Sequence, residues 1–186
     1  MEQYQVEPSL SPTMCVTKAS LSQHALNDKW VLYHHLPSNK NWTLSGYNVL
    51  LDDIDTVEKA ISINENTPEK MIKYSMLFLM RKGVTPLWED PRNKQGGCFS
   101  YKVVNKYVEQ VWREMFYLAC GESLGLNDSY SSHINGITIS PKKNFCIIKI
   151  WLQDQNHQDP NMIQTIEHLT KNGVVFKMHG ESANNG

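Results

Sequence analysis

Short apolar runs of strand length, separated by short polar links, are the strongest constraint on how this chain can fold. They occur along its whole length, at residues 30–35, 47–51, 74–80, 97–103, 136–140, 145–152 and 174–178. Runs of this length that end at Pro, Gly, Ser or Asn residues are typical of β-strands. Because links of hairpin length join the early runs, the sequence predicts an antiparallel sheet.

Helical spacing is clearest at residues 105–119. Apolar side chains recur there at steps of three and four residues, which predicts one buried helix face, and they are Val108, Val111, Trp112, Met115 and Ala119. Two shorter helices are expected earlier in the chain. Asp55 suits an N-cap, with Glu58 completing a capping box, and Pro68 suits the first position of a second helix.

A fourth helical segment is expected after Asp159, with Pro160 in its first turn. Its buried face would consist of Ile163, Ile166 and Leu169, and Gly173 would end it. The whole order is mostly strands with about three helices interspersed. It predicts an α+β fold in which the helices pack on one face of the sheet.

The length and charge of the chain indicate one domain and a limited anionic partner. At 186 residues we expect a single domain at 23–180, a disordered tail at 1–22 and a short tail at 181–186. The formal net charge of −1 argues against a protein that coats long nucleic acids, which usually carries a basic stripe. A protein that grips one nucleotide needs only a few local cations.

The cysteines and the hydropathy pattern indicate a soluble intracellular protein. Cys15, Cys98, Cys120 and Cys146 form no CxxC motif, so we interpret them as free thiols in a reducing compartment. The sequence has neither a signal peptide nor an apolar run of membrane length. We therefore expect a cytoplasmic monomer without a membrane partner, with the nucleus as a second location.

Trp42 and the pair Trp88 and Glu89 suggest a specific ligand. Two indoles from distant parts of the chain can hold one flat ring between their faces. A neighbouring carboxylate can accept two parallel N–H bonds from the edge of that ring. N7-methylguanine fits both requirements, because methylation makes the ring cationic and its N1–H and 2-amino groups point the same way. Taken alone, an isolated Trp is more often a core or interface residue.

Five short stretches make the pattern specific. In chain order they are HALNDKW at 24–30, DTVE at 55–58, PLWED at 86–90, NKQGG at 93–97 and GES at 121–123. Their order and spacing closely resemble the cap-binding translation initiation factors of the 4E family, over residues 24–178. The resemblance implies a curved antiparallel sheet with helices on its convex face and a cap slot on its concave face.

The resemblance also implies roles for individual residues in that slot. Trp42 and Trp88 would stack on the 7-methylguanine base, and Glu89 would bind its edge. Trp151 would lie near the N7-methyl group, with ordinary sheet core as the alternative. Glu89 would favour guanine over adenine, because adenine would leave the carboxylate unpaired at a cost of ~1–3 kcal/mol or more.

The phosphate end of the expected slot departs from the family pattern. Lys142 matches a position where the family usually has Arg, a second basic position is Ile147, and Cys98 replaces another Arg. We hypothesise that Lys149 or Lys143 replaces the missing charge, because alternate residues of a strand share one face. The alternative is a weaker contact with the triphosphate.

The expected protein-docking surface departs further from the family pattern than the phosphate end does. The family binds a scaffold protein or a repressor that carries a helical Tyr-x-x-x-x-Leu-Φ motif. Val57, Glu114 and His24 match family positions, although the Pro that normally follows His24 is Ala25. Ile61 replaces the key family Trp, while Arg113 and Tyr117 each replace a Leu. The surface could therefore serve a different partner, or Ile61 could simply face the core.

Three functions remain open at this point. The first is an initiation factor that brings capped mRNA to a scaffold, and the second is a cap-sequestering repressor or storage protein. The third, an enzyme acting on nucleotides, is not favoured, and no cofactor or metal is expected. The chain has neither an HExxH spacing nor a GxxxxGK loop, and its candidate bases are scattered at His34, His35, His133, His157, His168 and His179.

Overall fold

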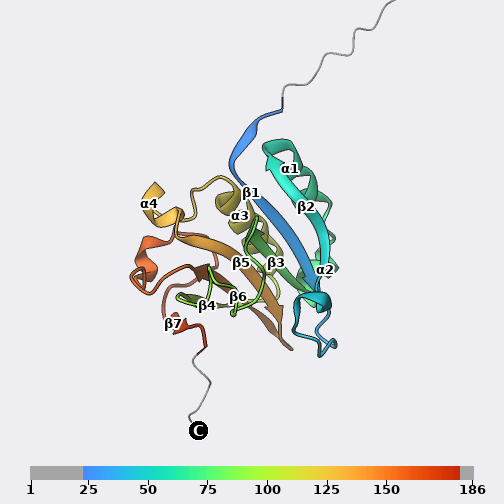
Figure 1. Ribbon diagram of the computed structural model, residues 1–186. Helices are drawn as coiled ribbons and strands as arrows, with labels where there is room; N and C mark the ends of the chain where they lie inside the picture. Colours follow the sequence, from blue (N-terminus) through green and yellow to red (C-terminus); the bar gives the residue numbers. More distant parts are fainter. Residues whose placement is uncertain (1–22, 181–186) are drawn as a thin grey trace, which may run out of the picture.

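One seven-stranded sheet forms the centre of the molecule, in a computed structural model that describes residues 23–180 (Figure 1). The strand order is β2-β1-β3-β5-β6-β4-β7, and every neighbouring pair is antiparallel. The strands are β1 (Ala25–His35), β2 (Asn48–Thr56), β3 (Met76–Arg81), β4 (Gly97–Val104), β5 (Ile134–Pro141), β6 (Phe145–Leu152) and β7 (Val175–Met178). The predicted antiparallel sheet is therefore confirmed. The tails expected at 1–22 and 181–186 lie outside the described residues.

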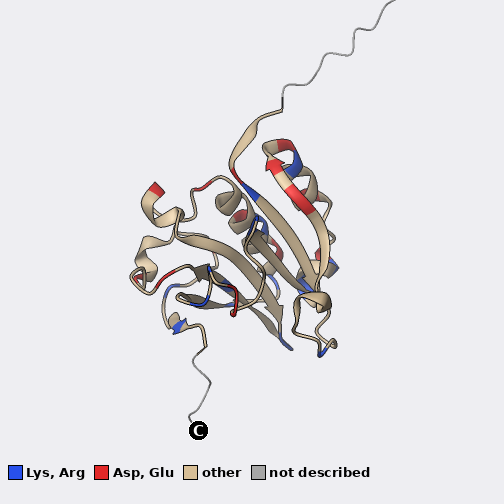
Figure 2. Cartoon of the chain, in the orientation of Figure 1, with Lys and Arg blue, Asp and Glu red and all other residues tan. Residues whose placement is uncertain are grey.

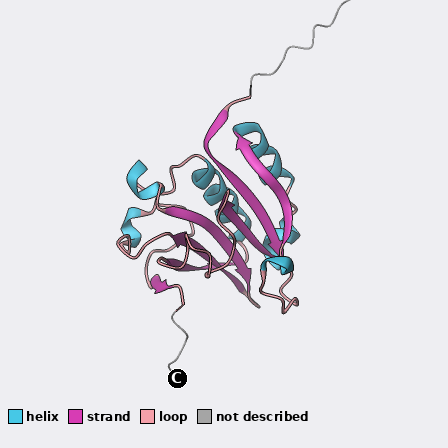
Figure 3. Ribbon diagram, viewed as in Figure 1, coloured by secondary structure: helices cyan, strands magenta, loops and turns pink. Residues whose placement is uncertain are grey.

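Three helices cover one face of the curved sheet, as Figure 3 shows. They are α1 (Val57–Asn66), α2 (Glu69–Tyr74) and α3 (Val108–Cys120). A one-turn helix α4 (Asp128–Ser131) precedes β5, and 3₁₀ turns occur at Leu44–Gly46 and Pro160–Met162. The predicted α+β class, with about three helices on the convex face, is confirmed. Within 23–180, no helix has the length and apolar character to cross a membrane.

The side chains of β3 alternate between two apolar layers. Leu77 and Leu79 are fully buried in the main core beneath the helices, whereas Phe78 and Met80 belong to a smaller cluster on the other face. We call this second layer the concave cluster, which consists of Phe78, Met80, Val84, Cys98 and Trp151. Burial on both faces explains why the strand runs are almost continuously apolar.

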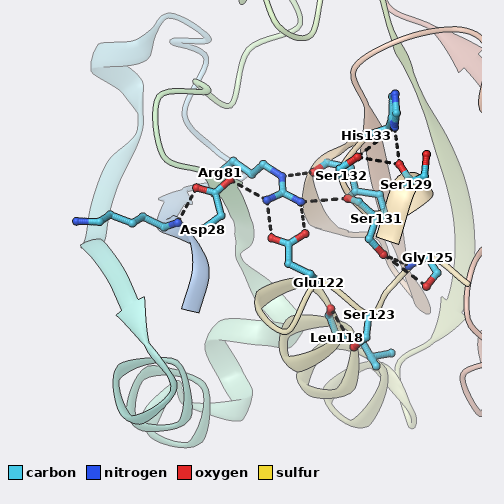
Figure 4. A network of polar contacts seen from close by, with 12 residues as sticks. Asp28, Arg81, Leu118, Glu122, Ser123, Gly125, Ser129, Ser131, Ser132 and His133 are labelled. Carbon is cyan, nitrogen blue, oxygen red and sulfur yellow. Dashed lines mark hydrogen bonds and ion pairs between the residues drawn. The ribbon is translucent and has the colours of Figure 1, made fainter. Parts of the chain in front are cut away.

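A buried ionic network joins β1, β3 and the end of α3 (Figure 4). Arg81 is only 4% exposed and binds Glu122, Asp28 and the carbonyl oxygen of Ser131. Its guanidinium carbon also lies 4.7 Å from the ring centroid of Trp30. Removing one partner of such a network typically costs ~3–5 kcal/mol. The stretches at 24–30 and 121–123 therefore stabilise the fold.

The start of α1 differs by one residue from the prediction. Thr56 is the N-cap, and its hydroxyl oxygen accepts from the backbone N–H of Lys59. Asp55 instead binds the Lys59 ammonium at 2.7 Å. Glu58 accepts from the backbone N–H of His24 at 3.1 Å, so it closes no capping box with Asp55. Pro68 is likewise the N-cap of α2 and not its first helical residue.

The helix predicted after Asp159 is wrong. Asp159 does cap the backbone N–H of Asn161, but the 3₁₀ turn ends at Met162, and Ile163 is extended. The backbone N–H of Gln164 donates to the carbonyl oxygen of Leu124, and the segment pairs with residues 124–126. The expected apolar face is nevertheless buried, with Ile163, Ile166 and Leu169 at 0%, 3% and 5% exposure.

Candidate functional site

A cleft of about 300 Å³ lies on the concave face, opposite the three helices. Its floor comes from β3, β5 and β6, and its walls come from the loops before β2 and β4. The lining residues are Trp42, Tyr47, Met76, Phe78, Pro86, Leu87, Trp88, Glu89, Thr138, Ser140, Lys149 and Trp151. The sequence prediction that Trp42, Trp88, Glu89 and Trp151 lie close together is consistent with this arrangement.

Trp42 stands on the loop between β1 and β2, and the residue as a whole is 51% exposed. One ring face stacks on the buried His35, with centroids 4.4 Å apart and planes inclined by 10°. His35 Nε2 lies 2.9 Å from the carbonyl oxygen of Asn41, and the Asn41 side chain accepts from the Thr43 N–H. The loop therefore fixes the indole against His35 and leaves much of its surface open.

Trp88 and Glu89 stand on the loop between β3 and β4, where Trp88 is 47% exposed. Asp90 holds this loop, because its carboxylate accepts from the N–H and hydroxyl of Thr85 and from the N–H of Arg92. Burial opposes ionisation of Asp90, but these hydrogen bonds outweigh burial and lower its pKa.

Asn93 supports the same loop from beneath and is fully buried. Its side-chain amide donates to the carbonyl oxygens of Thr85 and Leu87, and Asn135 donates to its side-chain oxygen. The stretches at 86–90 and 93–97 thus combine two exposed residues with buried polar supports. Preorganised loops of this kind reduce the entropy lost when a ligand binds.

Tyr47 and Trp151 complete the floor. The Tyr47 ring meets Phe78 edge-on at 5.1 Å, and burial together with the charge of Glu89 raises the Tyr47 pKa to about 12. Trp151 is 7% exposed, and its indole N–H donates to the hydroxyl of Thr138 at 3.2 Å. Trp151 is thus both a core residue and part of the cleft.

The matches with known proteins agree with this architecture. The family model described as Eukaryotic initiation factor 4E matches residues 25–186. The chain belongs to the eukaryotic initiation factor 4E family. It is 30% identical to the Eremothecium gossypii factor over 162 residues, 83% of this chain and 70% of that protein. It is 27% identical to the homolog of Acanthamoeba polyphaga mimivirus over 140 residues, 64% of this chain and 52% of that protein.

Solved structures share the fold of this 4E-family chain. A Schistosome eIF4E complexed with m7GpppG and 4E-BP matches with a TM-score of 0.64 at 25% identity, covering 72% of this chain and 74% of that one. A complex of C. elegans eIF4E-3 with the 4E-binding protein Mextli and a cap analog matches with a TM-score of 0.65 at 23% identity. It covers 75% of this chain and 80% of that one.

Of the three basic residues expected at the phosphate end, one lines the cleft and two lie outside its lining. Lys149 lines the cleft from β6 and shares its face with Ile147 and Trp151, while the alternate residues of β6 enter the main core. Lys142 and Lys143 are exposed in the turn between β5 and β6 and do not line the cleft. Lys149 is therefore the best placed of the three for a ligand in the cleft.

The charge of Lys149 acts on two neighbouring groups, the Cys98 thiol and the His179 ring. Cys98 is 4% exposed on β4, and burial raises the pKa of its thiol. The His179 ring lies 4.6 Å from Trp151, and burial with the nearby Lys149 charge lowers its pKa to about 4. A neutral His179 and a neutral thiol leave Lys149 as the cation at this end of the cleft lining.

The residues expected at the docking surface gather around α1 and α3 of this 4E-family chain. Val57 and Ile61 are 37% and 47% exposed, so the alternative that Ile61 faces the core is wrong. Glu114 is partly exposed on α3, and His24 Nδ1 lies 2.7 Å from Glu58. A partly apolar surface is therefore open on the helical face.

Arg113 and Tyr117 are engaged within the chain. The Arg113 guanidinium binds Glu109 and donates to the carbonyl oxygens of Asn64 and Thr67, which ties α3 to the end of α1. The Tyr117 hydroxyl donates to Glu65 at 2.5 Å. The resemblance described above leads us to expect Leu at both positions.

Sequence reasoning missed several residues of the cleft, notably Tyr47, Met76, Phe78, Thr138 and Ser140. Strand alternation offered one signal, because Met76 and Phe78 lie two residues apart on β3 and therefore share a face. Strand alternation alone does not identify the face that carries the cleft, because the loops that form the cleft walls decide it. The stacking of His35 on Trp42 was also missed, because the two residues lie on either side of a turn.

Proposed function

We propose that this chain binds the 7-methylguanosine 5′ cap of mRNA in the concave cleft and recruits capped mRNA to translation initiation. One observation carries the proposal. Trp42 and Trp88 come from two separate loops, each is about half exposed, and both line one cleft together with Glu89. Single exposed apolar residues are common, but exposed indoles that line one cleft together are typical of a ligand-binding site.

Stacking between the two indoles accounts for the preference for a methylated base. N7-methylation places positive charge on guanine, and a cationic ring interacts more strongly with electron-rich indole faces. Base–aromatic stacking contributes ~1–3 kcal/mol per base. Trp151 would approach the methyl group with its ring, since its N–H is already bound to Thr138.

Glu89 would select guanine through the Watson–Crick edge. An ionised carboxylate can accept from N1–H and the 2-amino group together. Its charge is already felt by Tyr47 on the cleft floor, which supports a position beside the bound base. A base without this donor pair would bury the carboxylate without partners.

Lys149 would meet the triphosphate, with Lys142 and Lys143 as outer cations. Lys149 lines the cleft, whereas the other two are exposed in the adjoining turn. A lysine acts as a point charge and lacks the two-pronged geometry of Arg. We therefore expect binding of the base to dominate the affinity.

The helical face would dock a scaffold protein or a repressor with a helical Tyr-x-x-x-x-Leu-Φ-like motif. The contributing residues would be His24, Val57, Ile61, Arg113, Glu114 and Tyr117. The Schistosome and C. elegans structures that share this fold are complexes with 4E-binding proteins as well as cap analogs, which supports both partners. We propose a cytoplasmic, monomeric binding protein and assign it no catalytic step.

A cap-sequestering repressor or storage protein is the second candidate function. The observation in its favour is that Arg113 and Tyr117 make polar contacts within the chain where the family pattern has Leu. A motif peptide that contains Tyr-x-x-x-x-Leu-Φ separates the candidates. Micromolar or tighter binding supports an initiation factor, whereas cap binding without peptide binding supports sequestration.

Retention on 7-methyl-GTP resin tests the proposed cleft. We expect the 186-residue chain to be retained and to elute with free 7-methyl-GTP but not with GTP. The matched control is Tyr74→Leu, which removes a 65% exposed aromatic residue of α2 on the opposite face and should leave retention unchanged. Elution by GTP at the same concentration would contradict the proposal.

A further inference from the structure

Three potential metal ligands from two segments meet at the end of the sheet where β5 begins and β6 ends. His133 immediately precedes β5, and Asp154 and His157 follow β6. One ligand atom from each residue lies within 4.8 Å of the other two. His133 Nε2 is 3.5 Å from Asp154 Oδ2, and His157 Nδ1 is 2.8 Å from Asp154 Oδ1. We call these three residues the His-Asp-His cluster.

The His133 ring is oriented as a metal-binding imidazole usually is. Its Nδ1 lies 2.6 Å from the carbonyl oxygen of Ser129, and Figure 4 shows the ring beside that residue. A carbonyl acceptor keeps the proton on Nδ1, so the lone pair of Nε2 points toward Asp154. Metal-bound histidines almost always have such a partner on the second nitrogen.

Asp154 and His157 are also held in place. The Asp154 Oδ1 accepts from the backbone N–H of Asn156 at 2.8 Å, while His133 Nε2 is the neighbour of Oδ2. The Tyr130 hydroxyl donates to the carbonyl oxygen of His157 at 2.7 Å. The loop that carries both ligands is therefore held by its own backbone groups, and the Asn156 N–H occupies Oδ1 of Asp154 but leaves Oδ2 beside His133.

The cluster is partly sheltered but can be reached from solvent. The side chains of His133, Asp154 and His157 are 25%, 26% and 23% exposed. His157 also lines an open cleft of about 640 Å³, which offers a path for an ion and for a water ligand. Within residues 23–180, His133, Asp154 and His157 form a group of potential metal ligands that combines two imidazoles with one carboxylate.

We propose that the His-Asp-His cluster binds one Zn²⁺ ion. Two imidazoles and one carboxylate are a typical three-residue zinc ligand set, with water in the fourth position. Tetrahedral zinc with ligand bonds of about 2.0–2.1 Å places neighbouring ligand atoms roughly 3.3 Å apart. His133 Nε2 lies 3.5 Å from Asp154 Oδ2, close to that value, whereas His157 Nδ1 lies 2.8 Å from the other carboxylate oxygen, at hydrogen-bond distance. Small side-chain rotations would complete the site, with the His157 proton on Nε2.

The bound ion would join the start of β5 to the loop after β6. These segments already share one backbone hydrogen bond, from the N–H of Gln153 to the carbonyl oxygen of His133. The site is separate from the residues proposed to bind the cap, so it does not depend on that proposal. The competing interpretation is a carboxylate that merely accepts hydrogen bonds from two histidines.

Metal titration of the chelator-treated, 186-residue chain tests the site. Co²⁺ serves as a visible probe, and Zn²⁺ affinity is measured in competition with a chromogenic chelator. We expect one ion per chain, tetrahedral Co²⁺ absorption bands that Zn²⁺ abolishes, and a higher thermal midpoint with Zn²⁺. His157→Ala and Asp154→Asn should each weaken Zn²⁺ binding at least tenfold.

Two control variants keep the test specific. His34→Ala removes a histidine of β1 that is remote from the cluster, and Cys15→Ser removes a thiol outside the described residues. Both should bind Zn²⁺ like the unaltered chain. The proposal is overturned if the unaltered chain shows no tetrahedral Co²⁺ bands, or if folded Asp154→Asn, verified by circular dichroism, keeps full affinity. Asp154→Asn nearly preserves the shape of the side chain. If His157→Ala fails to fold, the Zn²⁺ affinity of Asp154→Asn therefore still decides the test.

Discussion

The two faces of the sheet are built in different ways. The helical face covers a large core in which Trp112 is 1% exposed, whereas the cleft face covers the small concave cluster and carries half-exposed Trp42 and Trp88 on loops. The sequence resemblance leads us to expect cap-stacking aromatics in the cleft and a Trp on the helical surface, where this chain has Ile61. Because a packed sheet separates the faces, we expect substitutions on the proposed docking surface to leave the cleft unchanged.

The largest effect that this comparison predicts is on stability. Trp112→Ala should lower the free energy of unfolding by ~3–5 kcal/mol, because it leaves a cavity in the main core. Denaturant unfolding measures the loss, and a 7-methyl-GTP titration of the folded protein should show nearly unchanged affinity. Loss of ligand affinity in a folded variant would mean that the two faces are coupled.

Trp88→Leu should have the opposite effect, a large loss of ligand affinity with little loss of stability. We expect the affinity for 7-methyl-GTP to fall about 10- to 100-fold, because one stacking surface worth ~1–3 kcal/mol is removed. The free energy of unfolding should change by less than ~1 kcal/mol, since Trp88 is 47% exposed. Isothermal titration calorimetry and denaturant unfolding of the same samples check both halves. Unaltered affinity would remove Trp88 from the proposed site.

Glu89→Gln should weaken 7-methyl-GTP binding by about tenfold. The amide keeps the size of the carboxylate but can accept only one of the two N–H bonds and carries no charge. Glu69→Gln is the matched control, because Glu69 is an exposed acid on α2 that pairs with Lys73. Competition binding provides the measurement. Equal affinities for the two variants would show that Glu89 does not recognise the base edge.

Lys149→Ala should have the smallest effect, a loss of about fivefold for 7-methyl-GTP, or ~1 kcal/mol. The affinity for 7-methylguanosine, which lacks phosphates, should stay unchanged. Lys143→Ala should lose less, because its side chain is outside the cleft lining. Salt titration sharpens the comparison, since ionic contacts with phosphate weaken as ionic strength rises. An equal loss for nucleoside and nucleotide would exclude a phosphate role for Lys149.

Most of the fold could be predicted because its strongest signals are local. Residues 105–119 repeat every three or four positions, and α3 buries the predicted side chains. The segment after Asp159 shows the limit of this reasoning. Ile163, Ile166 and Leu169 have a spacing that also suits a helix, but their backbone pairs with residues 124–126, a contact that no local pattern records.

The cleft was predictable only in part for a related reason. Trp42, Trp88 and Glu89 were predicted because five short stretches of the chain, in their order and spacing, resemble a family pattern, whereas the three residues alone are a weak signal. Tyr47 and Phe78 are ordinary apolar residues until the fold shows which face of β3 lies beneath the loops. The cations posed the same difficulty, since Lys143 and Lys149 are close in sequence but only Lys149 lines the cleft.

Quenching of intrinsic tryptophan fluorescence by 7-methyl-GTP, compared with GTP, tests the central claim most directly. Trp42 and Trp88 are the exposed indoles of the described chain and both line the cleft. We predict saturable quenching by 7-methyl-GTP with an affinity at least tenfold above that for GTP. Indistinguishable titrations with the two nucleotides would contradict a methyl-selective cap site.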